Sequence, residues 1–381
     1  LMPIPAISDD EFQECREDDI LVSVRWMSGV HLCSFAIPAG ATVSLLKQRL
    51  CQRGVPLFTQ KLLLDSHILE DYEVLWQSVD VQLVMQPFRK YPSQSLLSCV
   101  VAGDHAGMVL MLRSKAHPDF RQNGQTPLSV AAEQGRLDFV RQLCEVGASK
   151  DTVGADKLTP LAVAARRGHL EIVRYLCEFG ANIDKATDTG DTAFLIASRW
   201  GHLETVKYLC EARASMEQSH KGTSALIAAS DSGHLDVVQW LCESGADKDH
   251  ADSDGQSAVF VASSKGHIRV VQYLCEIRAD INKSDMDDTT PLYDAAFSGH
   301  LKVVRCLCEA GAKKDQPTIE EGYTPLMIAA ACGHKEIVQY LCEAGASKDA
   351  RDKNGATALE FLKSRQETPL VFMIKQMLAS A

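Results

Sequence analysis

The segment GHLEIVRYLCEFGA, residues 168–181, decides the fold of this 381-residue chain because the chain repeats it. Six near-copies begin at Gly135, Gly201, Gly233, Gly266, Gly299 and Gly333, so that successive copies start 32–34 residues apart. A period close to 33 that persists through seven copies indicates a solenoid, in which each unit buries its apolar face against its neighbours.

Each repeated unit contains a second signature, which lies about nine residues before the glycine and reads Thr159-Pro160-Leu161 in the copy quoted above. A hydroxyl N-cap followed by proline begins a helix, and the glycine at position 168 ends it. Apolar residues at helical spacing, from Leu170 to Cys177, then predict a second helix. Each unit is therefore predicted to be a helix, a tight turn, a second helix and a polar turn.

The stretch TPLAVAARRGHLEIVRYLCEFGANID, residues 159–184, resembles the ankyrin-repeat family closely, and the resemblance covers roughly residues 93–381. It implies a mainly α fold, an ankyrin-repeat α-solenoid of about eight to nine helix-turn-helix units. We expect a degenerate first repeat at 93–122, regular repeats at 123–355 and a C-terminal cap at 356–381. The family's usual His after Thr-Pro-Leu is replaced here, by Ala162, Tyr293 and Met327.

The first 88 residues follow a different pattern. Residues 1–19 are acidic and predict a flexible leader. From Ile20, alternating apolar residues, a turn, a helix and two further strands predict a small α+β domain of order β-β-α-β-β. The stretch GVPLFTQKLLLDSHILED, residues 54–71, resembles ubiquitin-like domains, which implies such a domain over residues 20–88. Because the chain continues into the repeats, conjugation as a modifier is not expected.

Strand parity in this domain predicts an exposed apolar patch. If Leu62 and Val81 face the core, Leu63 and Val84 face outward. Exposed apolar patches often mark contacts, and the matching positions of the ubiquitin family form its main recognition surface. Two alternatives stay open: the patch docks a ubiquitin receptor, or it packs on the neighbouring repeats, since the linker at 89–93 is short.

Histidine and cysteine recur in the repeats, yet their placement predicts scaffold roles. The histidines that follow the repeat glycine are one repeat apart, too far to share a metal, and the resemblance implies that they tie the turn to adjacent backbone. Seven cysteines occupy one position at the end of the apolar stripe, where a small residue packs, and neighbouring helices are too far apart for disulfides or zinc. No phosphate loop, dinucleotide motif or protease motif is present. We therefore expect no enzyme activity, catalytic residue, cofactor or metal.

Candidate partner-binding residues are those that differ between copies. The residues just before each repeat glycine are expected to line a concave face, where arginine and tryptophan are favoured interface anchors. The candidates are Arg166, Arg167, Arg199, Trp200, Asp231, Lys265 and Phe297, with Leu63 and Val84 in the first domain. Polar turn tips such as Asp252, Asp285, His220 and Ile319 form a second set. The alternative is a solvated surface on which neighbouring side chains cover Trp200.

The composition and charge argue against some classes of binding partner. A net charge of −11 argues against broad binding to nucleic acid or acidic lipid. No apolar run predicts a membrane span, and no secretory signal is recognised, so a monomer in the cytoplasm is expected, with the nucleus as an alternative. The predicted function is a non-catalytic scaffold or adaptor that binds partner proteins through the concave face and turn tips. The alternative is an adaptor of the ubiquitin–proteasome system, whose first domain docks a receptor while the repeats select a client.

Overall fold

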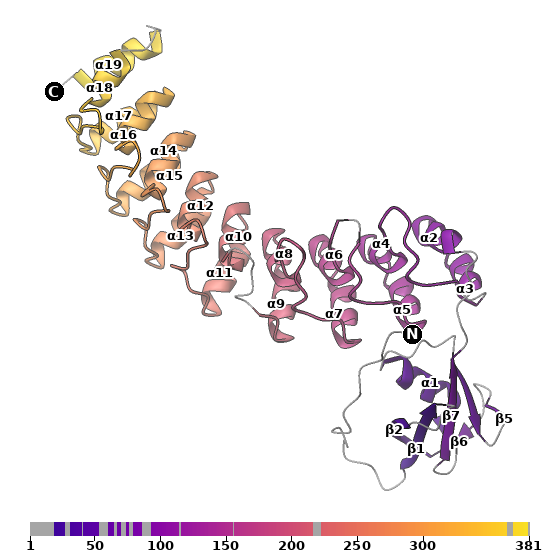
Figure 1. Ribbon diagram of the computed structural model, residues 1–381. Helices are drawn as coiled ribbons and strands as arrows, with labels where there is room; N and C mark the ends of the chain where they lie inside the picture. Colours follow the sequence, from indigo (N-terminus) through magenta and orange to yellow (C-terminus); the bar gives the residue numbers. More distant parts are fainter. Residues whose placement is uncertain are drawn as a thin grey trace. The chain divides into compact units, whose positions relative to one another are not determined.

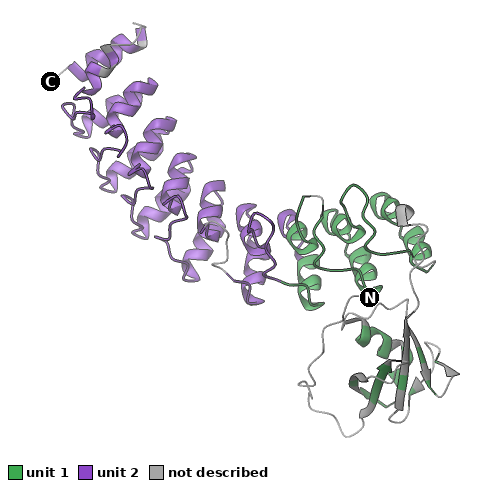
Figure 2. Ribbon diagram, in the orientation of Figure 1, with its two compact units in different colours: residues 1–164, 171–182 green, residues 165–170, 183–381 purple. Residues whose placement is uncertain are grey.

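The computed structural model describes residues 19–26, 31–39, 41–52, 60–64, 67–69, 74–75, 79–85, 93–113, 116–154, 156–215, 222–363 and 369–379. Of the predicted acidic leader, only Asp19 falls inside these ranges. The chain divides into two compact units, which Figure 2 distinguishes by colour: residues 1–164 with 171–182, and residues 165–170 with 183–381.

The N-terminal part of the first unit is a mixed sheet with one helix. A five-stranded sheet has the order β2-β1-β7-β4-β5, and β3 and β6 form a separate pair. β1 pairs antiparallel with β2 and parallel with β7, and β7 pairs antiparallel with β4. The elements are β1 (Asp19–Trp26), β2 (His31–Pro38), β3 (Ala41–Thr42), α1 (Val43–Gln52), β4 (Gln60–Leu64), β5 (His67–Ile68), β6 (Val74–Leu75) and β7 (Val79–Met85).

The core of this part joins the sheet to α1. Leu46 and Leu50 of α1 are fully buried together with Leu62 of β4 and Val81 of β7. The inward half of the predicted strand parity is therefore confirmed for Leu62 and Val81. In the ladder between β4 and β7, Leu63 pairs with Gln82 and Lys61 with Val84. The side chains of Leu63 and Val84 lie outside the described part of the chain, so the exposed patch stays a prediction.

The repeats of the first unit begin with four short helices. They are α2 (Ser93–Ala102), α3 (His105–Arg113), α4 (Pro127–Glu133) and α5 (Leu137–Glu145). The helices α6 (Pro160–Arg167) and α7 (Leu170–Glu178) follow, and their residues are divided between the two units. The first pair carries no Thr-Pro-Leu start, in keeping with a degenerate first repeat.

The second unit continues the alternation of helices and contains two layers. α8, α10, α12, α14, α16 and α18 adjoin one another in that order, as do α9, α11, α13, α15, α17 and α19 (Figure 1). Their bounds are α8 (Ala193–Arg199), α9 (Leu203–Glu211), α10 (Ala225–Ser232), α11 (Leu235–Glu243), α12 (Ala258–Ser264), α13 (Ile268–Glu276), α14 (Pro291–Ser298), α15 (Leu301–Glu309), α16 (Pro325–Cys332), α17 (Lys335–Glu343), α18 (Ala358–Lys363) and α19 (Pro369–Ala379). The predicted helix-turn-helix unit is thus confirmed over the described repeats.

The start and stop signals act as predicted. The Thr290 hydroxyl accepts a hydrogen bond from the Tyr293 backbone N–H at 3.2 Å, and Pro291 occupies the first turn of α14. Gly299 ends the same helix in the left-handed conformation, with φ of 82°, where a residue with a Cβ is strained. The same combination of hydroxyl cap and glycine recurs at α10 and α16.

The recurring histidines hold successive repeats together. His202 Nε2 donates to the carbonyl oxygen of Arg166, His267 to that of Asp231, and His300 to that of Ser264, each at 2.9 Å. Each acceptor belongs to the preceding repeat, so the predicted tie between turn and adjacent backbone is confirmed. The bonds also fix the backbone of the residues that precede each repeat glycine.

The recurring cysteines are less buried than their place in the pattern predicts. Cys144 is buried, but the other six members of the series are only half-buried. The reason is that the position lies at the edge of the apolar stripe, next to the glutamate that ends each second helix. None of these seven cysteines forms a disulfide, and burial still raises the pKa of the Cys177 and Cys275 thiols to about 12.

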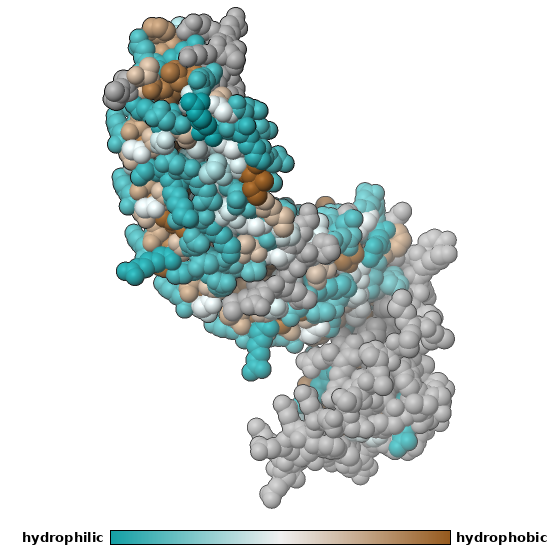
Figure 3. All heavy atoms as spheres, turned by 60° about the vertical axis from the view of Figure 1, so that its left-hand side comes forward, coloured by the Kyte–Doolittle hydropathy of each residue, from teal (hydrophilic) through white to brown (hydrophobic). Residues whose placement is uncertain are grey.

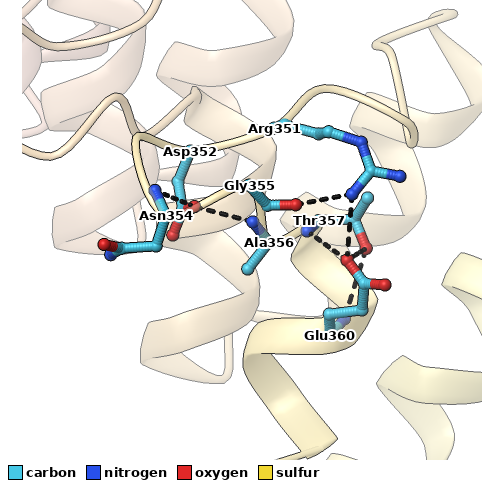
Figure 4. Close-up of polar contacts among 7 residues, drawn as sticks. All are labelled: Arg351, Asp352, Asn354, Gly355, Ala356, Thr357 and Glu360. Carbon is cyan, nitrogen blue, oxygen red and sulfur yellow. Dashed lines mark hydrogen bonds and ion pairs between the residues drawn. The ribbon is translucent and has the colours of Figure 1, made fainter.

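A network of short-range hydrogen bonds holds the turn before α18 and the start of this helix (Figure 4). Asp352 Oδ1 accepts from the backbone N–H groups of Asn354 and Ala356, at 2.9 and 2.8 Å, and closes the turn. Thr357 and Glu360 then form a capping box: the Thr357 N–H donates to Glu360 Oε2 at 2.9 Å, and the Glu360 N–H donates to Thr357 Oγ1 at 3.3 Å. This box begins α18, and α19 closes the described chain.

Candidate functional site

The predicted concave-face residues of the repeats lie at the ends of the first helices of successive repeats. Arg166 and Arg167 end α6, Arg199 ends α8, and Trp200 follows it. The remaining three, Asp231, Lys265 and Phe297, lie in or directly after α10, α12 and α14. Trp200 is 55% exposed and Phe297 is 50% exposed. Neighbouring side chains therefore do not cover Trp200, whereas the choice between a partner contact and a solvated surface stays a prediction.

Three of these residues line a single groove. Asp231, Lys265 and Phe297 surround a groove of about 390 Å³ that crosses α10, α12 and α14. The turns that precede α12 and α14 complete its walls. The other lining residues are Gln256, Phe260, Val261, Ser264, Asp285, Thr289, Tyr293 and Asp294. This volume falls in the range of known ligand sites. Of the predicted turn tips, Asp285 also lines the groove.

The groove combines an apolar floor with an aromatic wall. Phe260 and Val261 of α12 are buried and pack with Ile227 of α10. Tyr293 and Phe297 stand four residues apart on α14 and so share one face of that helix. Burial raises the pKa of the Tyr293 phenol to about 12, so that this side chain is a neutral hydrogen-bonding group at physiological pH.

The charged residues around the groove are mostly acidic. Asp231, Asp285 and Asp294 carry carboxylates, whereas Lys265 is the one cation of the lining. Within the described residues, none of these four side chains takes part in an ion pair. Asp285 Oδ1 accepts from the N–H groups of Asp287 and Thr289, at 3.0 and 2.8 Å, and burial raises the pKa of this carboxyl.

The arginines near Trp200 do not form part of this groove. Arg199 Nη1 contacts Asp191 Oδ2 at 2.9 Å, so its guanidinium is tied to the turn before α8. The Arg166 carbonyl is the acceptor for His202. The residues of the predicted basic and aromatic spot therefore lie outside this groove, and Arg167 and Trp200 among them are exposed.

Tyr293 and Asp294 of the groove were not among the predicted site residues, although the repeat pattern contains a signal for both. Tyr293 replaces the usual His of the first helix, as noted from the sequence. Asp294 follows it, at a position where the other copies have an apolar residue, such as Val163, Ala228 or Ile328. A comparison of every position of the first helix, rather than of its end alone, would have identified both.

The turn tips of neighbouring repeats are joined through their backbones. The Met286 N–H donates to the Asp254 carbonyl at 3.1 Å, and the Ile319 N–H donates to the Asp287 carbonyl at 3.0 Å. Met286 and Ile319 are exposed, and His220 lies outside the described residues. The face of the repeats shown in Figure 3 is mainly hydrophilic, with separate apolar spots. The tips of these three repeats thus lie side by side, with isolated exposed apolar residues.

No helix in the described part of the chain is both long and apolar enough to cross a membrane. In the same residues, no group of three or more His, Cys, Asp or Glu side chains could hold a metal ion.

Comparison with known proteins identifies the repeats. A family model described as ankyrin repeats (3 copies) matches residues 96–187, 146–220, 179–252 and 226–318, and one described as ankyrin repeats (many copies) matches residues 315–362. A search of the curated proteins found no match. The family matches together span residues 96–362, well over half of the sequence. With its stacked helix pairs, hydroxyl caps and inter-repeat histidines, the chain belongs to the ankyrin-repeat family.

Proposed function

We propose that this protein is a non-catalytic scaffold that binds partner proteins through the first helices and turn tips of its repeats. Ankyrin repeats suggest a role in protein–protein interaction, and the groove across α10, α12 and α14 is the observation that supports this assignment here. Its walls come from positions that differ between copies, on a backbone that the histidine bonds hold in place. A preformed surface loses little conformational entropy when it binds.

Exposed aromatic residues supply candidate anchors for the partner. Trp200 and Phe297 lie at the ends of two first helices of the same unit, and both leave half or more of their surface in solvent. Tryptophan and other large aromatic residues are enriched where truncation costs most binding energy. We therefore assign Trp200 and Phe297 as contact residues, with Asp231 and Lys265 between them in sequence.

An affinity capture with the full chain tests this function. The immobilised wild-type protein is compared with the double variant Trp200→Ala, Phe297→Ala, and with Glu336→Ala, an exposed position on the second-helix layer. We expect specific proteins to be retained by the wild type and by Glu336→Ala but lost from the double variant, while the melting temperature stays nearly unchanged. Equal retention by all three would refute the assignment, as would a double variant that loses binding only because it unfolds.

We also propose that residues 20–88 form an integral ubiquitin-like domain. Two strands, a helix and further strands in this order support the proposal, as does the parallel pairing of the first and last strands. Receptor docking through Leu63 and Val84 stays a prediction. An NMR titration of the chain with a ubiquitin receptor tests it, and the absence of shifts at both residues would exclude docking there. A cytoplasmic monomer remains part of the proposal.

A further inference from the structure

We propose that the groove across α10, α12 and α14 binds an arginine side chain from an exposed basic segment of the partner protein. This inference rests on the protein-binding function proposed above and names the chemistry of the partner. It combines three independent properties of the groove: its charge, its aromatic wall and its length along the repeats.

The charge of the groove favours a cation. The lining contains three aspartates and one lysine, a formal excess of two negative charges. Asp231 and Asp294 have no side-chain hydrogen bond or ion pair within the described residues, whereas Asp285 already accepts two backbone N–H groups. Asp231 and Asp294 are therefore the carboxylates available to a ligand, and Asp285 shapes the turn that walls the groove.

The aromatic wall selects among cations. Tyr293 and Phe297 present ring surfaces on one side of α14, and Phe297 is half exposed. A guanidinium can stack on an aromatic ring while its N–H groups donate to a carboxylate in its plane, and arginine is the side chain that does both. An ammonium is more strongly hydrated and forms no bidentate pair with a carboxylate. The groove therefore fits arginine better than lysine.

The length of the groove favours a peptide over a single small cation. Its lining comes from three successive first helices and from the two turns between them. The buried side chains of Phe260 and Val261 give it an apolar floor. An extended segment can place an arginine against α14 and a neighbouring apolar residue on α12. The groove also disfavours an acidic partner segment, because its three carboxylates repel negative charge.

Binding of four fluorescein-labelled octapeptide pools to the full chain, followed by anisotropy, tests the proposal. The pools are random apart from one fixed central residue, which is arginine, lysine, citrulline or glutamate. Citrulline retains the shape of arginine but lacks its charge. We expect the arginine pool to bind about tenfold more tightly than the citrulline pool, with lysine between them and no binding of glutamate, and we expect added salt to weaken it. Citrulline binding as tight as arginine, or no binding of the arginine pool, would overturn the proposal.

Variants of the protein locate the site. Asp294→Asn and Phe297→Ala are each expected to weaken binding of the arginine pool about tenfold. Glu243→Gln removes the same charge from an exposed position on α11 and should leave binding within twofold. A loss with Glu243→Gln equal to that with Asp294→Asn would show a diffuse charge effect and overturn the site. Unaltered melting temperatures show that the variants are folded.

The two proposals fail in different ways. If the wild-type protein still captures proteins that the Trp200→Ala, Phe297→Ala variant loses, while Asp294→Asn and the citrulline pool make no difference, only the arginine site is wrong. If no protein is captured in the affinity experiment, the scaffold function itself is wrong.

Discussion

His267 Nε2 donates to the carbonyl oxygen of Asp231 at 2.9 Å. This bond holds two successive repeats together, and it also fixes the backbone of a residue that lines the groove. The imidazole also lies directly over Gly233, where a Cβ atom would come within 2.6 Å of His267 Nδ1. The recurring Gly-His pair therefore serves the scaffold twice: the glycine ends one helix and leaves room for the histidine of the next repeat.

Gly233→Ala is expected to destabilise the protein more than Gly245→Ala. Both glycines have positive φ, 78° and 93°, which costs about 1–2 kcal/mol for a residue with a Cβ. Gly245 has open space around its Cβ position, whereas the new methyl at 233 would displace His267 and break its bond to Asp231. Urea denaturation should show an additional loss of roughly 1–3 kcal/mol for Gly233→Ala, the usual cost of overpacking. Equal losses would mean that the histidine ring moves freely.

Leu176→Ala should lower the free energy of unfolding by about 2–5 kcal/mol, because it leaves a cavity in the interior. Leu176 is fully buried on α7. The control Glu178→Ala changes an exposed residue two positions later on the same helix, and it should stay within about 0.5 kcal/mol of the wild type. Urea midpoints followed by circular dichroism compare the two. Similar midpoints for both variants would contradict the assignment of Leu176 to the core.

The recurring cysteines should react slowly with iodoacetamide. Burial raises the pKa of Cys177 and Cys275 to about 12, and that of Cys242 and Cys308 to about 11, so few of these thiols are ionised at pH 8. The thiolate is the reactive form. Cys332 is exposed and serves as the internal control. Mass spectrometry of timed samples should show alkylation of Cys332 first; faster labelling of Cys177 would contradict its burial.

The same thiols should make the protein less stable in alkali. Cys177 loses its proton near pH 9 when unfolded and near pH 12 when folded. Between these values the unfolded chain binds fewer protons, and the free energy of unfolding therefore falls as pH rises. Below pH 9 this contribution is fully present. Urea denaturation at pH 8 and pH 10 measures the effect, which should be smaller in Cys177→Ala than in the wild type.

Thr357→Ala should destabilise α18 by about 1 kcal/mol, because it removes the hydroxyl that caps this helix. It breaks the bond from the Glu360 N–H to Thr357 Oγ1, whereas Arg351→Ala removes only an exposed ion pair to Glu360 at 3.5 Å and the bond to the Gly355 carbonyl. Exposed pairs contribute little. Amide hydrogen exchange over residues 358–363 should therefore rise clearly in Thr357→Ala and only slightly in Arg351→Ala. Equal exchange in both would show that the cap is not what holds this helix.

Much of the scaffold could be predicted because the same local sequence signals recur in successive repeats. The Thr-Pro start, the glycine stop and the apolar stripe recur at a fixed period, so one unit predicts the next. The degree of burial is less predictable. The pattern places the recurring cysteines in the core, yet most are half-buried, because the pattern alone does not separate the middle of an apolar stripe from its edge. The sequence does not decide whether Trp200 is exposed or covered, because its 55% exposure depends on which side chains neighbour it in space.

The sequence by itself determined the helix pairs, their order and the family of the repeats, because caps, stops and apolar spacing act over a few residues and need no distant partner. The tertiary structure decided which variable residues share a surface. Asp231, Lys265 and Phe297 lie about one repeat apart in sequence, and only the stacking of α10, α12 and α14 brings them to one groove with Tyr293 and Asp294. The tertiary structure also places Trp200 and Arg199 outside that groove, and Arg199 pairs with Asp191.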